Sequence, residues 1–420
     1  MLYSFKVILT EEKMGRYTAY GPEVDAFIKK HYLDKIVEVF VKECNPVAII
    51  LFGGFGKGEG SVYFRNGKPV PFNDFDLYVV TQKKLNDKTL NSLSMHASAA
   101  IGMGGLEIAY FPGEKYDAKK YFHVDVRCLP VGSLKKLMSI QRYYELKYGS
   151  QVIYGDATIL EKINPIKKED LPESDGLRNL FNKLHTLLLG LQPTYDVDSQ
   201  RIRIFWSYKC YLSICEALLI SEKKFEATAR KRMEVFASLW EYSFPELKKE
   251  IPDLATKIKI ATEFKLKPDF SVGGEGLWAE ALKDMLLVFA YYVKRMTGVD
   301  DVGEAISDHL PFTYFAPFLK EKIGFNFWPS QYILNVGYVS VLQKEGEFYV
   351  RPLLQWKDVG LRMILPIYFL LLYKHTTNSF WLDKAYDQLQ QFIKTEKKEF
   401  WYLRERALKA YGLYYEQRLL

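Results

Sequence analysis

The sequence has little cysteine, and none of it is arranged in close pairs. The chain of 420 residues contains 4 cysteines, and their wide spacing includes no CxxC motif: Cys44, Cys128, Cys210 and Cys215. This spacing argues against a zinc site built on cysteine pairs, and it excludes the dense disulfide framework of small secreted domains. We therefore expect a reducing, cytoplasmic setting.

Long apolar runs are also missing. The most apolar segment, residues 363–373, has about half the ~20 residues that a membrane-spanning helix needs, and it contains Pro366. We expect it to be a buried core helix. The first residues of the chain lack a basic stretch followed by a long apolar region and a small-residue cleavage site, so we expect no secretion signal.

A strong excess of one charge is absent too. The chain has 58 basic and 51 acidic residues, with a formal net charge of +7. Over a surface of this size the excess is mild, so it permits an anionic ligand such as a nucleotide and does not favour nucleic acid as the partner. A hydrophobic content of 48%, including 15% aromatic residues, predicts a compact protein with a sizeable core.

Glycine, in contrast, is concentrated in one short stretch. Residues 51–61, "LFGGFGKGEGS", carry five glycines and one lysine directly after an apolar run. Glycine is costly to order and packs nothing, so such a cluster is typical of a sharp turn or of backbone that a ligand approaches closely. A phosphate group is the usual ligand of such a loop.

The segments around this loop predict a sheet. Residues 22–44 have the periodicity of an amphipathic helix, and the β-branched run at 47–52 is typical of a strand buried on both faces. A hairpin turning at Asn66-Gly67 is expected within 61–70. Other expected elements are strands at 73–80, 106–111, 122–129 and 150–156, and helices at 84–101 and 133–147.

From about residue 175 the periodicity becomes helical. We therefore predict an α+β fold, with a mixed sheet and flanking helices in a catalytic domain at 1–160. A mainly α-helical C-terminal domain is expected at 161–420, with a small β-hairpin near 337–352. The proline-containing, charged segment between the two has little periodicity, which is typical of a boundary.

Three aspartates stand out on the predicted strands. Asp74 and Asp76 are two residues apart, so a strand directs both side chains to one face. Asp125 lies between two valines on a later strand and points the same way relative to the core. Carboxylates this close repel one another unless a cation sits between them. Such oxygen-rich sites suit Mg²⁺ together with substrate phosphates.

The order of these motifs resembles the nucleotidyltransferase superfamily that shares the DNA polymerase β core. Its members combine an hG[GS] loop after a strand, a following [DE]h[DE]h strand and a later h[DE]h strand. In this chain "FGGFGKG", "NDFDLY" and "HVDVR" match those motifs over roughly residues 22–156. Gly54 stands where the family often has serine, Lys57 where it usually has arginine, and the 61–70 hairpin lengthens the segment before the aspartates.

The resemblance implies roles for several residues. Asp74 and Asp76 would bind two Mg²⁺ ions, with Mn²⁺ as a substitute, and Asp125 would bind one of them and act as the base on the acceptor hydroxyl. Glu107, in "GLEIAY", also fits the third motif and stays an alternative to Asp125. The resemblance also implies nucleotide-binding residues in the loop and in the helical appendage: Gly53, Gly54, Lys57 and Lys209.

These features predict an enzyme that transfers a nucleoside monophosphate from an NTP to an acceptor hydroxyl and releases pyrophosphate. Because the charge is modest, a small or sugar-like acceptor is favoured. Template-independent addition to a nucleic-acid end, addition to a protein, and a non-catalytic nucleotide-binding regulatory role stay open as alternatives. Neither the acceptor nor the preferred NTP can be read from these residues.

Overall fold

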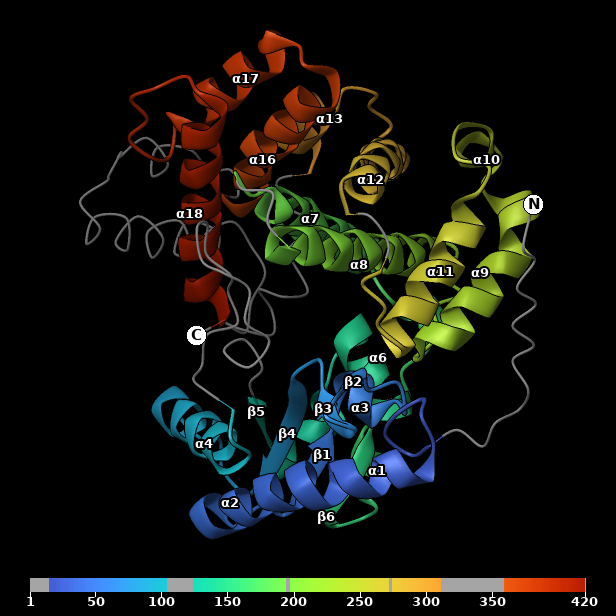
Figure 1. Cartoon of the computed structure of the whole chain (residues 1–420), viewed down its shortest axis with the longest axis vertical. Helices are drawn as coiled ribbons and strands as arrows, with labels where there is room; N and C mark the ends of the chain where they lie inside the picture. The colour runs from blue at the N-terminus through green and yellow to red at the C-terminus, as the bar shows by residue number, and fades with distance from the viewer. Residues whose placement is uncertain (1–14, 104–123, 194–196, 272–273, 311–358, 420) are drawn as a thin grey trace.

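The structure is a computed structural model that describes residues 15–103, 124–193, 197–271, 274–310 and 359–419. Figure 1 shows a sheet-containing part made by the chain up to Gly155 and a helical part stacked against one side of it. The predicted α+β class is confirmed at this level. The predicted strand at 106–111 and the hairpin near 337–352 lie outside the described residues.

A four-stranded mixed sheet organises the first part, in the order β5-β4-β1-β6. The central pair, β1 and β4, is antiparallel, β6 runs antiparallel to β1, and β5 runs parallel to β4. The strands are β1 (Ala48–Leu51), β4 (Phe75–Thr81), β5 (Val124–Pro130) and β6 (Gln151–Gly155). β1 is completely buried, as its apolar sequence predicted.

The two faces of the sheet belong to two different hydrophobic clusters. Side chains alternate along a strand, so Phe75, Leu77 and Val79 of β4 pack into one cluster with the N-terminal helices and α4. Tyr78 and Val80 point the other way and join the large core that continues through the helical part. Polar residues in the same alternation as Tyr78 therefore face the helical part.

The N-terminal helix is interrupted once. The predicted helix at 22–44 is formed by α1 (Pro22–Ile28) and α2 (Asp34–Cys44), joined by a π-helical turn at Lys29–Leu33. A further helix, α4 (Asp87–Ala100), is capped by Asn86, whose side chain accepts a hydrogen bond from the Thr89 amide. α2 and α4 cover the outer face of the sheet.

The predicted hairpin between the glycine loop and the aspartates is confirmed. It consists of β2 (Val62–Arg65) and β3 (Lys68–Pro71), which pair in antiparallel register. Asn66 and Gly67 both have positive φ angles, 52° and 73°, as a two-residue hairpin turn of the primed type requires.

The helix predicted at 133–147 is formed only in part, because the α-helix begins at Gln141. A 3₁₀ helix at Val131–Lys136 and the helix α6 (Gln141–Tyr148) stand in its place, with extended backbone between them. The Gln141 amide donates to the carboxylate of Asp175 at 2.6 Å, so a residue 34 positions away caps the first turn of α6. Local periodicity carries no signal of this contact.

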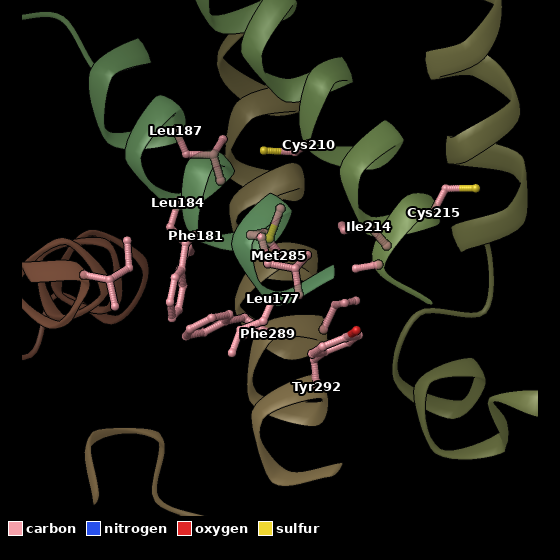
Figure 2. Close-up of a cluster of buried hydrophobic side chains, with 14 of the residues drawn as sticks. Leu177, Phe181, Leu184, Leu187, Cys210, Ile214, Cys215, Met285, Phe289 and Tyr292 are labelled. Atoms are coloured by element: carbon pink, nitrogen blue, oxygen red, sulfur yellow. The ribbon is translucent and has the colours of Figure 1, made fainter. Parts of the chain in front are cut away.

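The second part consists of helices packed on a common core. Figure 2 shows side chains of α7, α8 and α12 meeting in it, with Phe181 and Phe289 at 5.6 Å between ring centroids. The segment predicted as a buried core helix forms α16, with Pro366 inside it. The helices are α7 (Glu173–Gly190), α8 (Val197–Ser221), α9 (Ala229–Ser243), α10 (Pro245–Glu250), α11 (Leu254–Leu266), α12 (Gly274–Thr297), α13 (Val302–Glu304), α16 (Val359–Thr376), α17 (Ser379–Leu389) and α18 (Phe400–Leu419).

Candidate active site

The parallel pairing of β4 and β5 brings two of the predicted aspartates together. Asp76 and Asp125 are directly paired in the register of these strands. Their neighbours Phe75 and Val124 are buried in the outer cluster, so both carboxylates leave the sheet on the face that looks toward the helical part. Asp74 was predicted to lie on the strand, but β4 begins at Phe75 and Asp74 directly precedes it.

The glycine loop lies directly against Asp76. The Phe52 amide donates to the Asp76 carbonyl at 2.8 Å, and the one-turn helix α3 (Gly53–Gly56) follows. Gly53 has a φ of +62°, and a Cβ atom on it would lie 1.9 Å from Asp76 Oδ2. Only glycine fits here, because both the backbone angle and the close carboxylate exclude a side chain.

The start of this loop presents backbone donors beside the aspartates. The amides of Gly56 and Lys57 are bonded to the carbonyls of Phe52 and Gly53. Within the described ranges, no hydrogen-bond acceptor is found for the amides of Gly53 and Gly54. Both glycines are partly exposed, so an anionic ligand can reach these two amides.

The crowding of negative charge shows in the pKa of Asp76. Burial, and then the carboxylates of Asp74 and Asp125, raise the pKa of Asp76 well above its usual range. The cations Arg127 and Lys209 oppose this shift without cancelling it. A divalent cation among the three carboxylates would relieve the same repulsion.

Arg127 is a site residue that the sequence reasoning missed. It lies two residues after Asp125 on β5, so it shares that face of the strand, and its guanidinium donates to Asp125 Oδ2 at 3.2 Å. The signal was present in "HVDVRC", because a polar side chain two positions after a strand aspartate points the same way.

The donor set fits Mg²⁺ in its chemistry. Carboxylate oxygens are the protein ligands that Mg²⁺ prefers, and it is often bound by one or two of them with substrate phosphates completing the shell. No group of three or more aspartate, glutamate, histidine or cysteine side chains converges as a finished metal site in the part of the chain described.

Lys57 is placed beside the loop but is paired inside the protein. Its Nζ lies 2.8 Å from Glu145 Oε1, and its side chain is 8% exposed. Glu145 also bonds to Arg232 of α9, at 3.0 Å. The predicted contact of Lys57 with phosphates stays a prediction.

Lys209 projects from α8 toward the aspartates. It is among the cations that lower the pKa of Asp76, and its Nζ lies 5.0 Å from the centre of the Phe205 ring. It also lines a small pocket that contains four aromatic residues and reaches Asn73, next to Asp74. The pocket is lined by Ser61, Phe72, Asn73, Phe205, Tyr208, Lys209, Leu212, Phe264, Lys265 and Pro268. Glu107, the alternative third carboxylate, lies outside the described residues.

The chain has distant structural similarity to a protein of known structure. No family model and no curated protein matches the sequence. Among solved structures, the chain is similar to a spectinomycin adenyltransferase from Enterococcus faecialis, which was solved with ATP and spectinomycin. The identity is 13% and the TM-score 0.36, over 62% of this chain and 97% of that one.

None of the described helices has the length and apolar character needed to cross a membrane.

Proposed function

We propose that the protein is a Mg²⁺-dependent nucleotidyltransferase. The observation that carries this proposal is that β4, β5 and the glycine loop meet at one place. Asp76 lies beside Asp125 on parallel strands, and Gly53 lies against Asp76 with no room for a side chain. A glycine loop touching a carboxylate cluster brings a phosphate-binding backbone to the place where a metal-bound phosphate would lie.

The aspartates would hold the metal. Asp76 and Asp125 are paired on this face of the sheet, Asp74 directly precedes β4, and the repulsion that raises the pKa of Asp76 favours a bound cation there. When bound, Mg²⁺ polarises the phosphoryl oxygens and neutralises charge that develops on them. Mn²⁺ would substitute, since it takes the same oxygen ligands.

The chain's own groups would bind and orient the substrates. The amides of Gly53 and Gly54 donate to the β- and γ-phosphates of the NTP, and Lys209 approaches the same phosphates from α8. The acceptor oxygen attacks the α-phosphorus, the bond between the α-phosphorus and the bridging oxygen breaks, and pyrophosphate leaves. Oδ1 of Asp125 takes the hydroxyl proton, because Oδ2 is held by Arg127. A small or sugar-like acceptor fits the modest charge of the chain best.

The test is a transfer assay with the purified protein. Each α-³²P-labelled NTP is incubated with Mg²⁺ or Mn²⁺, with and without cell extract, and the labelled products are separated. We expect label to move to an acceptor with the wild type and with Asp87→Asn, an exposed aspartate of α4, but not with the double variant Asp74→Asn/Asp76→Asn. The mobility of the product separates a small acceptor from a nucleic acid or a protein.

Two results would count against this function. Transfer that persists in the double variant would remove the aspartates from the mechanism. NTP binding without transfer to any component of the extract would favour the non-catalytic regulatory role instead.

A further inference from the structure

The glycine loop carries one glutamate that is buried in the helical part. Glu59 is 1% exposed and lies between two glycines of the loop. Its Oε2 accepts a hydrogen bond from the Ala229 amide at 3.0 Å, and its Oε1 accepts one from the Arg230 amide at 2.9 Å. These are the first two residues of α9, so a residue of the loop caps a helix of the other part of the molecule.

The same carboxylate has a cationic partner on a second helix. Nζ of Lys265, on α11, lies 3.1 Å from Glu59 Oε2 and also donates to the Glu59 carbonyl at 3.4 Å. Although burial opposes ionisation, Lys265, Arg232 and the two amides lower the pKa of Glu59 to about 2. The buried charge is therefore fully compensated, which is the condition under which such a group is tolerated.

A second connection joins the loop to the same helix. Lys57, two residues before Glu59, pairs with Glu145, and Glu145 pairs with Arg232 of α9. Both ends of the Lys57–Glu59 segment are thus attached to α9, one directly and one through Glu145. Figure 1 shows the lower ends of α9 and α11 beside α3.

Fixing Glu59 also fixes the phosphate-facing end of the loop. The Glu59 amide donates to the Gly54 carbonyl at 2.8 Å, so the buried residue is hydrogen-bonded to the first turn of the loop. A glycine-rich segment has few side chains to hold its shape and loses much conformational entropy when it is ordered. An anchor outside the loop therefore reduces the number of conformations open to Gly53 and Gly54.

We propose that Glu59 is a positioning residue for the nucleotide: by binding α9 and Lys265, it holds the Gly53 and Gly54 amides in the arrangement that receives the phosphates. This inference rests on the proposed function. It makes the nucleotide site depend on contact with the helical part, even though the predicted phosphate-binding amides all lie in the sheet-containing part.

The test uses the full-length chain and compares variants that break the Glu59 contact with a control variant on the same helix, α11. Glu59→Gln and Lys265→Met break the contact with the loop. Lys257→Met is the matched control, because Lys257 is also on α11 and is also ion-paired, with Asp284 at 2.8 Å, but it does not touch the loop. Three quantities are measured well below the unfolding temperature: kcat, the KM for the NTP, and amide hydrogen exchange of residues 52–60.

We expect Glu59→Gln and Lys265→Met to raise the KM for the NTP about tenfold or more, with a smaller change in kcat. Exchange at residues 52–60 should be faster by a similar factor in both variants. Lys257→Met should lower the unfolding temperature without changing the KM for the NTP or the hydrogen exchange of residues 52–60. If Glu59→Gln lowers only the unfolding temperature, with KM and loop exchange as in the wild type, Glu59 is structural and the proposal is wrong.

Hydrogen exchange keeps this proposal separate from the proposed function. If the wild type neither binds nor transfers any NTP, the function fails while loop exchange still decides whether Glu59 orders the loop. If the wild type transfers nucleotide and the loop variants match it in KM, the function stands and the positioning role falls.

Discussion

The molecule contains two groups of carboxylates whose neighbours have opposite charges. At the candidate active site, Asp76 is crowded by Asp74 and Asp125, and its pKa is raised. At the contact between the two parts, Glu145 is surrounded by Lys57 and Arg232, and these cations lower its pKa despite burial. The second group of carboxylates and their cationic partners form what we call the interface ion network. It consists of Lys57, Glu59, Glu145, Glu216, Arg232 and Lys265.

The difference separates two kinds of carboxylate, one compensated by cations and one crowded by other carboxylates. A carboxylate whose neighbours are cations is already compensated and has no need of a ligand. A carboxylate whose neighbours are other carboxylates is kept at a cost to stability, and such strained electrostatics are typical of sites that bind or react. The contrast predicts opposite results when members of the two groups are neutralised.

The largest expected effect is the loss of activity in Asp76→Asn. Removing one carboxylate from the metal-binding set should lower kcat about 10³-fold or more, since metal stabilisation of a transition state is worth several kcal/mol. The unfolding temperature should stay the same or rise, because asparagine removes one of three crowded charges. Activity and thermal unfolding are measured on the same preparation, with Asp87→Asn as the control. A variant that loses both activity and stability would show that Asp76 is part of the structural framework.

The opposite result is expected for Arg232→Met. The Arg232 guanidinium is buried and pairs with Glu145 at 3.0 Å and Glu216 at 2.9 Å. Its removal leaves two carboxylates without this partner, and we expect the free energy of unfolding to fall by about 3–5 kcal/mol. Denaturant titration measures it. The control Lys248→Met breaks an exposed pair with Glu241 and should cost less than about 1 kcal/mol. An unchanged free energy of unfolding in Arg232→Met would mean that the network adds no stability.

The sequence predicted one of these two groups much better than the other. Asp76 and Asp125 lie on strands whose alternation of polar and apolar residues gives the direction of each side chain, whereas Asp74 lies just before its strand. Glycine density marked the loop for the same reason: the requirement at Gly53 is local to the backbone. Patterns of two or three residues are enough when the neighbours along the chain decide the geometry.

The interface ion network could not be predicted in this way. Glu59 and Lys265 are 206 positions apart, and nothing near either residue indicates the other. The same reason explains why the helix predicted at 133–147 is interrupted, since the carboxylate of Asp175 that caps α6 comes from a distant helix. Ion pairs and caps between distant segments are set by packing, which periodicity does not report.

A smaller effect is expected in acid. The pKa of Glu59 is lowered from 4.5 to about 2, so between these values the unfolded chain binds a proton that the folded chain does not. The stability from Glu59 is therefore present above pH 4.5 and is lost as the pH falls toward 2. For one such site the loss between pH 5 and pH 3 is about 2 kcal/mol.

Glu59→Gln separates this contribution from general acid unfolding. The variant should be less stable than the wild type at pH 6, and the difference should shrink as the pH falls to 3. Denaturant titrations at both pH values measure it. A difference that is constant with pH would show that the Glu59 charge does not contribute through its pairing with Lys265.

The smallest expected effect is stabilisation by Mg²⁺, and it sharpens the comparison because it should depend on one group of carboxylates alone. A ligand at ten times its dissociation constant stabilises the folded state by about 1.4 kcal/mol, which corresponds to a rise of roughly 1–3 °C in unfolding temperature for a large chain. We expect this rise in the wild type and in Lys265→Met, and none in Asp74→Asn/Asp76→Asn. Because Lys265→Met removes a partner of Glu59 and leaves the three aspartates in place, it should start from a lower unfolding temperature and still respond to the ion. An equal rise in the double variant would place the Mg²⁺ elsewhere on the protein, and the crowding around Asp76 would then need another explanation than metal binding.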